Sequence, residues 1–222
     1  MILVNYTSEN YKECLDIMRP TWEKYLDVGD KLLLYSDTEK FGEKIFEPSD
    51  DFNESCRRKI LVIQKVLKEN QGENVLYVDT DVMMMSFIDK SVFYKDVVAT
   101  RMIKRVDKGG EADINAGVSF WKANERTIKF CDRWLEDEKK YQDFKYPEQH
   151  AFNELCYEGY DNLAEWSVGN VSERIYNFEH DNPNVFLKWI PIYKPKLIHF
   201  KTKRWSDAFV MNRFYKISKS VL

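Results

Sequence analysis

Short apolar runs alternate with amphipathic stretches in the first third of the chain. The apolar runs Ile2–Asn5, Lys31–Tyr35 and Asn74–Val78 indicate buried strands. Between them, apolar residues spaced three or four apart predict helices over Tyr11–Leu26 and from about Ser55 to the Asn-Gln-Gly that precedes the third run. Strand, helix, strand, helix, strand in this order predicts a parallel sheet with right-handed crossovers.

The rest of the chain continues this α/β pattern. The further predicted elements are a strand at Val118–Trp121, helices over Arg126–Lys140 and Glu148–Tyr157, and short strands at Trp189–Tyr193 and Lys196–Phe200. Polar, irregular sequence fills Ser36–Asn53. Because no repeat, linker or shift in composition divides the sequence, we expect one domain over residues 1–222.

The composition narrows the class of protein. With 44% hydrophobic and 32% charged residues, the chain can form a packed core, which excludes collagen-like and low-complexity proteins. With a net charge of −3, the chain lacks the excess of basic residues that is typical of proteins that bind duplex nucleic acid, so we expect no nucleic-acid partner. No apolar run approaches the ~18 residues of a membrane span. No basic segment precedes the first strand, so we expect no signal peptide.

The cysteines indicate the cellular compartment. The four cysteines lie far apart in the sequence and form no Cys-x-x-Cys pair. Free thiols are therefore expected, rather than a disulfide or zinc framework. The sequence favours a cytoplasmic protein.

Two aspartates, Asp79 and Asp81, directly follow the third apolar run. Ligands of open α/β sheets bind at the carboxyl ends of the strands. In an extended strand, residues two positions apart point to the same side, so the two carboxylates can share one divalent cation. A bare Asp-x-Asp triplet is expected by chance about once in such a chain, and two solvated loop aspartates are the alternative. The apolar residues on both sides of the pair favour a metal or phosphate site.

Two enzyme classes fit this local pattern. In an aspartyl phosphatase, Asp79-Thr80-Asp81-Val82 would supply the nucleophile, but such an enzyme needs a later Gly-Asp for its Mg²⁺ site. The only Gly-Asp pair, Gly29-Asp30, lies upstream. In a metal-dependent sugar transferase, the two aspartates hold Mn²⁺ or Mg²⁺ against a nucleotide diphosphate.

Four further segments occur in an order known from one family. They are Thr7-Ser8-Glu9-Asn10-Tyr11 after the first strand, Asn115–Trp121 with its Asn-Ala-Gly, Glu148–Asn153 with its Glu-Gln, and Leu197-Ile198-His199-Phe200 followed by Lys201, Lys203, Arg204 and Trp205. Together with the two aspartates, they resemble the GT-A glycosyltransferases, in particular the retaining glycogenin-like and xylosyltransferase-like group. The resemblance spans residues 2 to 205. It implies a single-domain α/β GT-A (Rossmann-like) fold, with a mostly parallel twisted sheet flanked by helices.

The resemblance also implies roles for individual residues. The implied metal ligands are Asp79, Asp81 and His199, with Mn²⁺ or Mg²⁺ as the cofactor. The implied nucleotide and diphosphate contacts are Thr7, Tyr11, Lys59, Thr80, Lys201 and Lys203. The implied donor-sugar contacts are Asp113, Asn115, Ala116 and Gly117. The implied catalytic residues are Glu148, whose carboxylate binds donor-sugar hydroxyls, and Gln149, which lies under the anomeric carbon.

Several of these residues have structural alternatives. His199 could be a strand-end histidine satisfied by hydrogen bonds, and Tyr11 could belong to the core rather than stack on uracil. Lys59 could be a surface lysine, with Arg57 and Arg58 as rival phosphate contacts. Glu148 could simply complement a helix dipole. Lys201 and Lys203 could form a solvated charge run; the family's glycine and proline are missing there, which leaves open the identity of the phosphate contact.

The implied activity is transfer of a sugar from a UDP-sugar to a hydroxyl of a glycan or glycoprotein acceptor, with retention of anomeric configuration. No second acid is clearly placed as a general base, which suits an internal-return route in which the departing phosphate oxygen takes the acceptor proton. The aspartyl phosphatase and a catalytically silent nucleotide-sugar-binding module remain alternatives. A compact enzyme without the usual membrane anchor suits bacteria or large DNA viruses better than the Golgi lumen.

Overall fold

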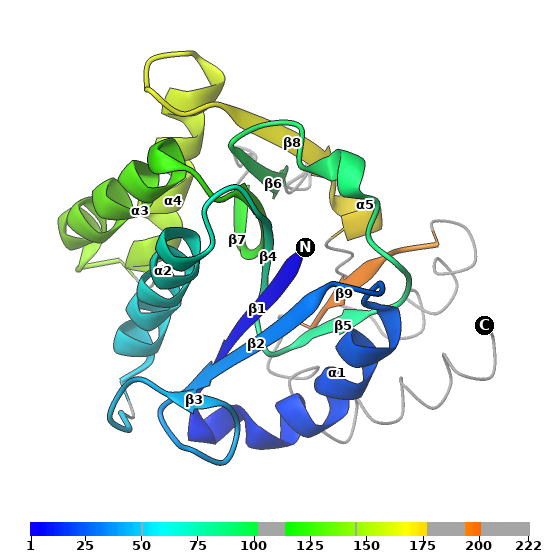
Figure 1. The fold of residues 1–222 in the computed structure, drawn as a ribbon. Coiled ribbons are helices and arrows are strands. Elements are labelled where there is room, and N and C mark those ends of the chain that lie inside the picture. The colour runs from blue at the N-terminus through cyan, green and yellow to red at the C-terminus, as the bar shows by residue number, and fades with distance from the viewer. Residues whose placement is uncertain (50, 102–113, 145, 177–193, 201–222) are drawn as a thin grey trace, which may run out of the picture.

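Helices cover both faces of a central sheet (Figure 1). The structure, a computed structural model, describes residues 1–49, 51–101, 114–144, 146–176 and 194–200. Its helices are α1 (Lys12–Tyr25), α2 (Phe52–Glu69), α3 (Glu125–Asp137), α4 (Pro147–Tyr160) and α5 (Glu173–Tyr176), with 3-10 turns at η1 (Glu9–Tyr11), η2 (Lys90–Val92) and η4 (Glu138–Tyr141). Helices α2, α3 and α4 lie together on one face, and α1 covers the other (Figure 1).

The central sheet has seven strands, and a two-stranded sheet accompanies it. In spatial order the seven are β3 (Glu43–Lys44), β2 (Lys31–Ser36), β1 (Ile2–Thr7), β4 (Asn74–Val78), β7 (Ile114–Lys122), β6 (Val97–Arg101) and β8 (Val168–Ser172). Strand β7 runs antiparallel to its neighbours β4 and β6, whereas the other neighbouring strands pair in parallel. The prediction of a mostly parallel α/β sheet is confirmed.

The central strands are apolar on both faces. In β1, Val4 packs in the cluster under α2, α3 and α4, whereas Leu3 packs in the cluster under α1. In β4, Tyr77 and Val78 divide between the two clusters in the same way. Successive side chains of a strand point to opposite faces. A strand buried on both faces therefore appears in the sequence as a continuous apolar run.

Helix α2 begins earlier than its apolar spacing predicts. Asp51 caps it, because the Asp51 side chain accepts a hydrogen bond from Asn53 N at 2.9 Å. The end is as predicted: Asn70 lies at the C-cap, where its Nδ2 donates to Val66 O at 2.9 Å. Helix α2 leads from the end of β3 to the start of β4, and these strands run parallel in the sheet. Its first turn therefore lies at the carboxyl edge of the parallel strands, where the aspartates follow β4.

Several elements differ from the prediction. The polar stretch Ser36–Asn53 contains the two-residue strand β3, and β5 (Val82–Met84), β6 and β8 were not predicted. The helix predicted over Arg126–Lys140 is α3 followed by η4. The last predicted strand is β9 (Leu197–His199), which pairs antiparallel with β5. The strand predicted at Trp189–Tyr193 lies outside the described residues.

All four cysteines are free, as the sequence predicts. In the part of the chain that the structure describes, no helix combines the length and the apolar character that a membrane crossing requires.

Candidate active site

The two aspartates lie in a tight turn between β4 and β5. Val82 N donates to Asp79 O at 3.1 Å, which closes a four-residue turn. Asp79 N donates to Gly117 O at 2.8 Å and ties the turn to β7. The two carboxylates therefore converge through a turn, and the expected reason, alternation along an extended strand, is wrong. Their predicted place at the carboxyl end of β4 is correct.

His199 completes a cluster of three side chains that can bind a metal. In the β5–β9 pair it lies opposite Val82, so that its Nε2 is 3.1 Å from Asp81 Oδ1 and 3.9 Å from Asp79 Oδ2. One potential ligand atom from each of the three residues lies within 4.8 Å of the other two. Two carboxylate oxygens and one imidazole nitrogen form a donor set suited to Mn²⁺ or Mg²⁺, and the nitrogen favours Mn²⁺.

Gly117 allows β7 to approach this cluster closely. A Cβ atom at position 117 would lie 2.5 Å from His199 Cε1 and would also contact Asp79 Oδ2. The glycine is held in place by its own N–H, which donates to Asn115 Oδ1 at 2.6 Å. Only glycine lets the Asp79 and His199 side chains lie this close to β7.

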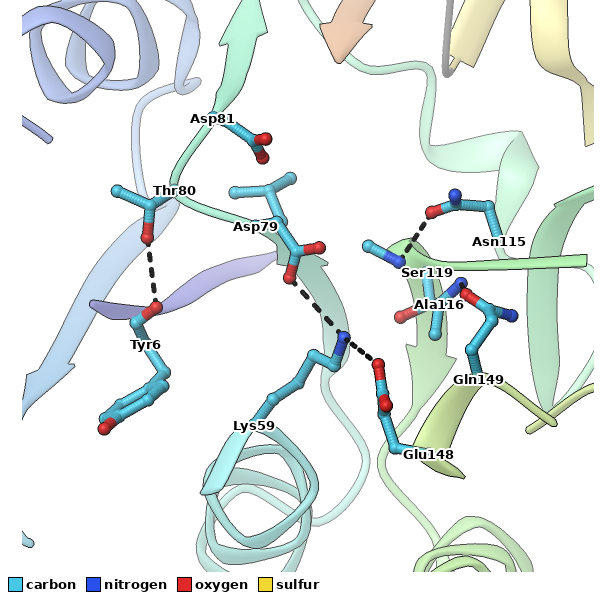
Figure 2. Close-up of polar contacts among 12 residues, drawn as sticks. Tyr6, Lys59, Asp79, Thr80, Asp81, Asn115, Ala116, Ser119, Glu148 and Gln149 are labelled. Carbon is cyan, nitrogen blue, oxygen red and sulfur yellow. Dashed lines mark hydrogen bonds and ion pairs between the residues drawn. The ribbon is translucent and has the colours of Figure 1, made fainter. Parts of the chain in front are cut away.

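Lys59 connects the aspartates to α4. Its Nζ lies 3.7 Å from Asp79 Oδ1 and 3.8 Å from Glu148 Oε1 (Figure 2). Burial lowers the pKa of Lys59, but the Asp79 and Glu148 carboxylates more than offset this and hold the pKa above its ordinary value. With 6% of its surface exposed, Lys59 is not the surface lysine that the sequence left open.

The two arginines beside Lys59 have other partners. Arg57 Nε lies 3.0 Å from Glu138 Oε1. Arg58 Nε donates to Glu54 Oε1 at 3.2 Å, and Arg58 Nη1 donates to Tyr6 OH at 3.3 Å. Of the three basic residues, the structure thus brings Lys59 to the aspartates.

Glu148 is a buried acid with an unused oxygen. It lies in the first turn of α4 and is 5% exposed. Its Oε1 faces Lys59, whereas its Oε2 is buried and accepts no hydrogen bond from the described residues. A buried acceptor without a donor is rare in folded proteins. The arrangement thus fits a ligand hydroxyl that donates to Oε2.

Gln149 holds the beginning of β7. Its Oε1 accepts a hydrogen bond from Ala116 N at 3.1 Å (Figure 2). Its Nε2 donates to Ile114 O. One turn later, Asn153 Oδ1 accepts from Ile114 N at 2.5 Å. The Glu-Gln helix start and the Asn-Ala-Gly strand are therefore locked together.

Buried hydroxyl groups join the end of β1 to the aspartate turn. Thr80 Oγ1 donates to Tyr6 O at 3.1 Å (Figure 2). It also lies 2.9 Å from Thr7 Oγ1. Asn5 Nδ2 donates to Val78 O at 2.9 Å and to Thr80 Oγ1 at 3.3 Å. Asn5 was not among the predicted site residues, although a polar residue in an otherwise apolar run was the available signal.

Tyr11 lies partly buried at the same edge. Burial, followed by the negative charge of Asp81, raises the pKa of its hydroxyl. It packs against the apolar cluster under α1, so it has core contacts as well as a position near the aspartates.

Most of the predicted site residues thus lie at one edge of the sheet. Those brought together there are Thr7, Tyr11, Lys59, Asp79, Thr80, Asp81, Asn115, Ala116, Gly117, Glu148, Gln149 and His199. Asp113, Lys201 and Lys203 lie outside the described residues, as do Arg204 and Trp205.

Comparison with known structures gives a consistent fold. A glycosyltransferase involved in the glycosylation of the major capsid of PBCV-1 is similar with a TM-score of 0.66, at 14% identity over 97% of this chain and 98% of that one. The galactosyltransferase LgtC, solved with donor and acceptor sugar analogs, is similar with a TM-score of 0.56, at 16% identity over 99% of this chain and 96% of that one. The bifunctional glycosyltransferase WbbM is similar with a TM-score of 0.60, at 12% identity over 91% of this chain and 46% of that one. These structures support the GT-A fold.

Sequence comparison gives the family. No curated protein matches the chain. The profile of one family, the nucleotide-diphospho-sugar transferases, matches residues 13–208, which include the aspartate turn, the Asn-Ala-Gly strand, the Glu-Gln helix start and His199. The chain therefore belongs to the nucleotide-diphospho-sugar transferase family, and as an enzyme it is a glycosyltransferase.

Proposed function

We propose that this enzyme transfers a sugar from a UDP-sugar to a hydroxyl group of a glycan or glycoprotein acceptor, with Mn²⁺ or Mg²⁺ as cofactor and with retention of anomeric configuration. The observation that carries the proposal is the convergence of Asp79, Asp81 and His199 at the end of β4, with Lys59 between Asp79 and Glu148, whose second oxygen is unused.

The three converging side chains would hold the cation. When bound, the cation neutralises the negative charge that develops on the departing diphosphate. The absence of a side chain at position 117 supports this assignment, because a larger residue would push the Asp79 and His199 side chains out of these positions. Lys201 and Lys203 are proposed as additional positive charges for the diphosphate.

Lys59 and Glu148 position the donor sugar in this proposal. The Lys59 ammonium lies between the Asp79 and Glu148 carboxylates and balances their charge. Glu148 Oε2 is then available to accept a hydrogen bond from a sugar hydroxyl. Gln149, through Ala116, holds the Asn-Ala-Gly strand against the sugar. Asp113 and Asn115 are proposed as further partners of sugar hydroxyls.

The nucleotide is proposed to lie over the end of β1. Tyr11 would present its ring to the uracil, and Thr7 and Thr80 fix the backbone between β1 and the aspartate turn. These contacts tie the base site to the metal site through buried hydrogen bonds.

Retention is proposed from the set of family motifs. In an internal-return route, the departing phosphate oxygen takes the proton of the acceptor hydroxyl, so the chain need not supply a general base. The free cysteines support action in a reducing compartment, and we propose the cytoplasm.

Calorimetry with UDP, with and without Mn²⁺, tests the proposal. A transferase of this kind should bind UDP tightly only with the metal. A phosphatase should ignore UDP, and a silent module should bind UDP but hydrolyse no UDP-sugar. A screen for slow hydrolysis of UDP-sugars then identifies the donor. NMR of the first-formed product from a UDP-α-sugar should show an α linkage, and a β linkage would contradict retention.

A further inference from the structure

Two exposed aromatic side chains lie together where α2 and α4 begin. Phe52, the first residue of α2, is 47% exposed, and Tyr146, the N-cap of α4, is 39% exposed. Their ring centroids are 5.8 Å apart at an angle of 72°. Each ring covers part of the other and leaves the remainder open to solvent. Contiguous exposed apolar groups of this kind mark binding surfaces more often than scattered single residues do.

This pair is continuous with the active site. Phe52, Cys56 and Lys59 are spaced four and three residues apart, so they follow one face of α2. At 1.5 Å per residue, Phe52 lies about 10 Å along the helix from Lys59. On α4, Tyr146 stands two residues before Glu148, which faces the same lysine. The two helices therefore form a wall from the Lys59–Glu148 pair to the aromatic pair.

The surroundings of the rings fit a sugar better than an apolar partner. Asp51 and Asn53, on either side of Phe52, are exposed and polar. The Arg57 side chain, one turn further along α2, is 47% exposed. A pyranose ring has an apolar face of C–H groups and a rim of hydroxyls, so it needs an aromatic surface with hydrogen-bonding groups around it. Two rings in a polar setting are too small a patch for a stable protein–protein interface.

We propose that Phe52 and Tyr146 form an acceptor subsite that stacks against a sugar ring, and that the acceptor is therefore a glycan. This inference rests on the proposed function, since it places the acceptor beside the donor site. A position about 10 Å from Lys59 along α2 suits a ring of the acceptor beyond the sugar that is modified.

Acceptor kinetics test this subsite. Methyl glycosides of glucose, galactose, mannose and xylose, and methyl glycosides of their disaccharides, serve as probes with the best UDP-sugar from the hydrolysis screen. Phe52→Ala and Tyr146→Ala should each raise the KM for the best glycoside about tenfold, the size of one aromatic contact. UDP affinity with Mn²⁺ and UDP-sugar hydrolysis without acceptor should stay at the wild-type level. Phe52→Tyr and Tyr146→Phe should keep the wild-type KM, because stacking uses the ring.

A second aromatic pair, in which one ring is exposed, provides the control. Phe87 is 50% exposed and packs edge-on against Tyr25 at 5.7 Å, so Phe87→Ala removes a comparable ring from another part of the surface. Its acceptor KM should not change. Wild-type acceptor KM values in both Phe52→Ala and Tyr146→Ala would overturn the subsite. An enzyme that hydrolyses UDP-sugars but uses none of the glycosides would overturn it too. Failure of the wild-type protein to bind UDP would instead overturn the proposed function.

Discussion

His199 Nε2 lies 3.1 Å from Asp81 Oδ1, although the two residues belong to distant parts of the sequence. Their contact follows from one backbone pairing, because His199 stands opposite Val82 in the β5–β9 sheet. Phe200 N donates to Asp81 O at 3.1 Å and fixes the same register from the other side. The cluster that would hold the metal is thus built by main-chain hydrogen bonds rather than by flexible side chains alone.

Asp81→Asn should abolish metal-dependent UDP binding. The amide loses the negative charge that the cation requires and leaves the diphosphate under-neutralised. Calorimetry with UDP and Mn²⁺ measures the loss, and we expect at least a hundredfold weaker affinity, or about 2.7 kcal/mol. Asp89→Asn is the control, because exposed Asp89 is not part of the metal-binding cluster and caps η2 through Ser91 N. Similar small effects in both variants would remove the metal site.

His199→Ala should lose the stabilisation that Mn²⁺ and UDP confer together. At ligand concentrations a hundredfold above Kd, binding stabilises the wild-type fold by about 2.7 kcal/mol, and the variant should lose most of this. The metal-free melting temperature should change much less. His150→Ala, an exposed histidine packed on Tyr141 and Phe144, is the control. A variant that melts early without ligand, yet keeps the wild-type metal response, would make His199 structural.

Gly117→Ala should block the site sterically. The new methyl group would press on the Asp79 carboxylate and on His199 Cε1, so metal-dependent UDP binding should fall at least tenfold. Gly159→Ala is a matched control, since its methyl group would collide with Val168 and Trp166, away from the cluster. That control should lower the melting temperature but keep UDP affinity. The reverse pattern would show that the space beside Gly117 is not used.

Lys59→Met should destabilise the metal-free protein. Loss of the ammonium leaves two carboxylates, Asp79 and Glu148, uncompensated, which costs about 2–4 kcal/mol of unfolding free energy. Because the Lys59 pKa is raised in the fold, its contribution is fully present below its ordinary pKa and so applies at neutral pH. Urea unfolding at pH 7 measures this cost, and added Mn²⁺ should recover part of it.

The control for this variant comes from the same helix. Lys65→Met removes a more exposed lysine, paired with Glu69 within α2, and should cost under about 0.5 kcal/mol. Equal losses in the two variants would contradict the special position of Lys59.

Glu138 should give the stability a pH dependence near neutrality. Burial raises its pKa to about 7; Arg57 partly opposes this, and Glu148 adds to it. Between its ordinary pKa and about 7, the folded state holds a proton that the unfolded state has lost, so the unfolding free energy falls as pH rises. The effect is on the order of 1 kcal/mol. Glu138→Gln should flatten this slope in urea unfolding between pH 5 and pH 8. Glu13→Gln, at an exposed position of α1, should leave the slope unchanged.

The sequence predicts β1, β2 and β4 well, because each is a run of mostly apolar residues, and β1 and β4 are buried on both faces. Asn74–Val78 matches β4 at both ends. The missed strands are of a different kind. Strand β8, for example, carries Gly169, Asn170 and Ser172, so its pairing with β6 rests on main-chain hydrogen bonds rather than on an apolar pattern. Strand β3 consists of two exposed residues and exists only because β2 offers it an edge.

Residue types and their order along the chain predicted the members of the site. They did not predict the individual contacts that bring these residues together. Asp-x-Asp after an apolar strand is visible in the sequence, but the turn that brings the carboxylates together depends on Gly117 O, which belongs to a distant strand. The contact of Lys59 with Glu148 likewise joins two helices whose relative position no local spacing encodes. Periodicity therefore reports which face of an element is buried, whereas the site depends on which elements meet.

The pairing of β9 with β5 also sets an order of events during synthesis. A nascent chain that has emerged from the ribosome as far as residue 176 already contains all the strands that the structure describes in the central sheet, together with both aspartates. It lacks His199, the third member of the metal-binding cluster, which arrives with β9. The metal-binding cluster therefore cannot be complete until β9 has been made, and a chain cut short between these points would lack both the third ligand and the buried residues Leu197 and Ile198 of the cluster under α1.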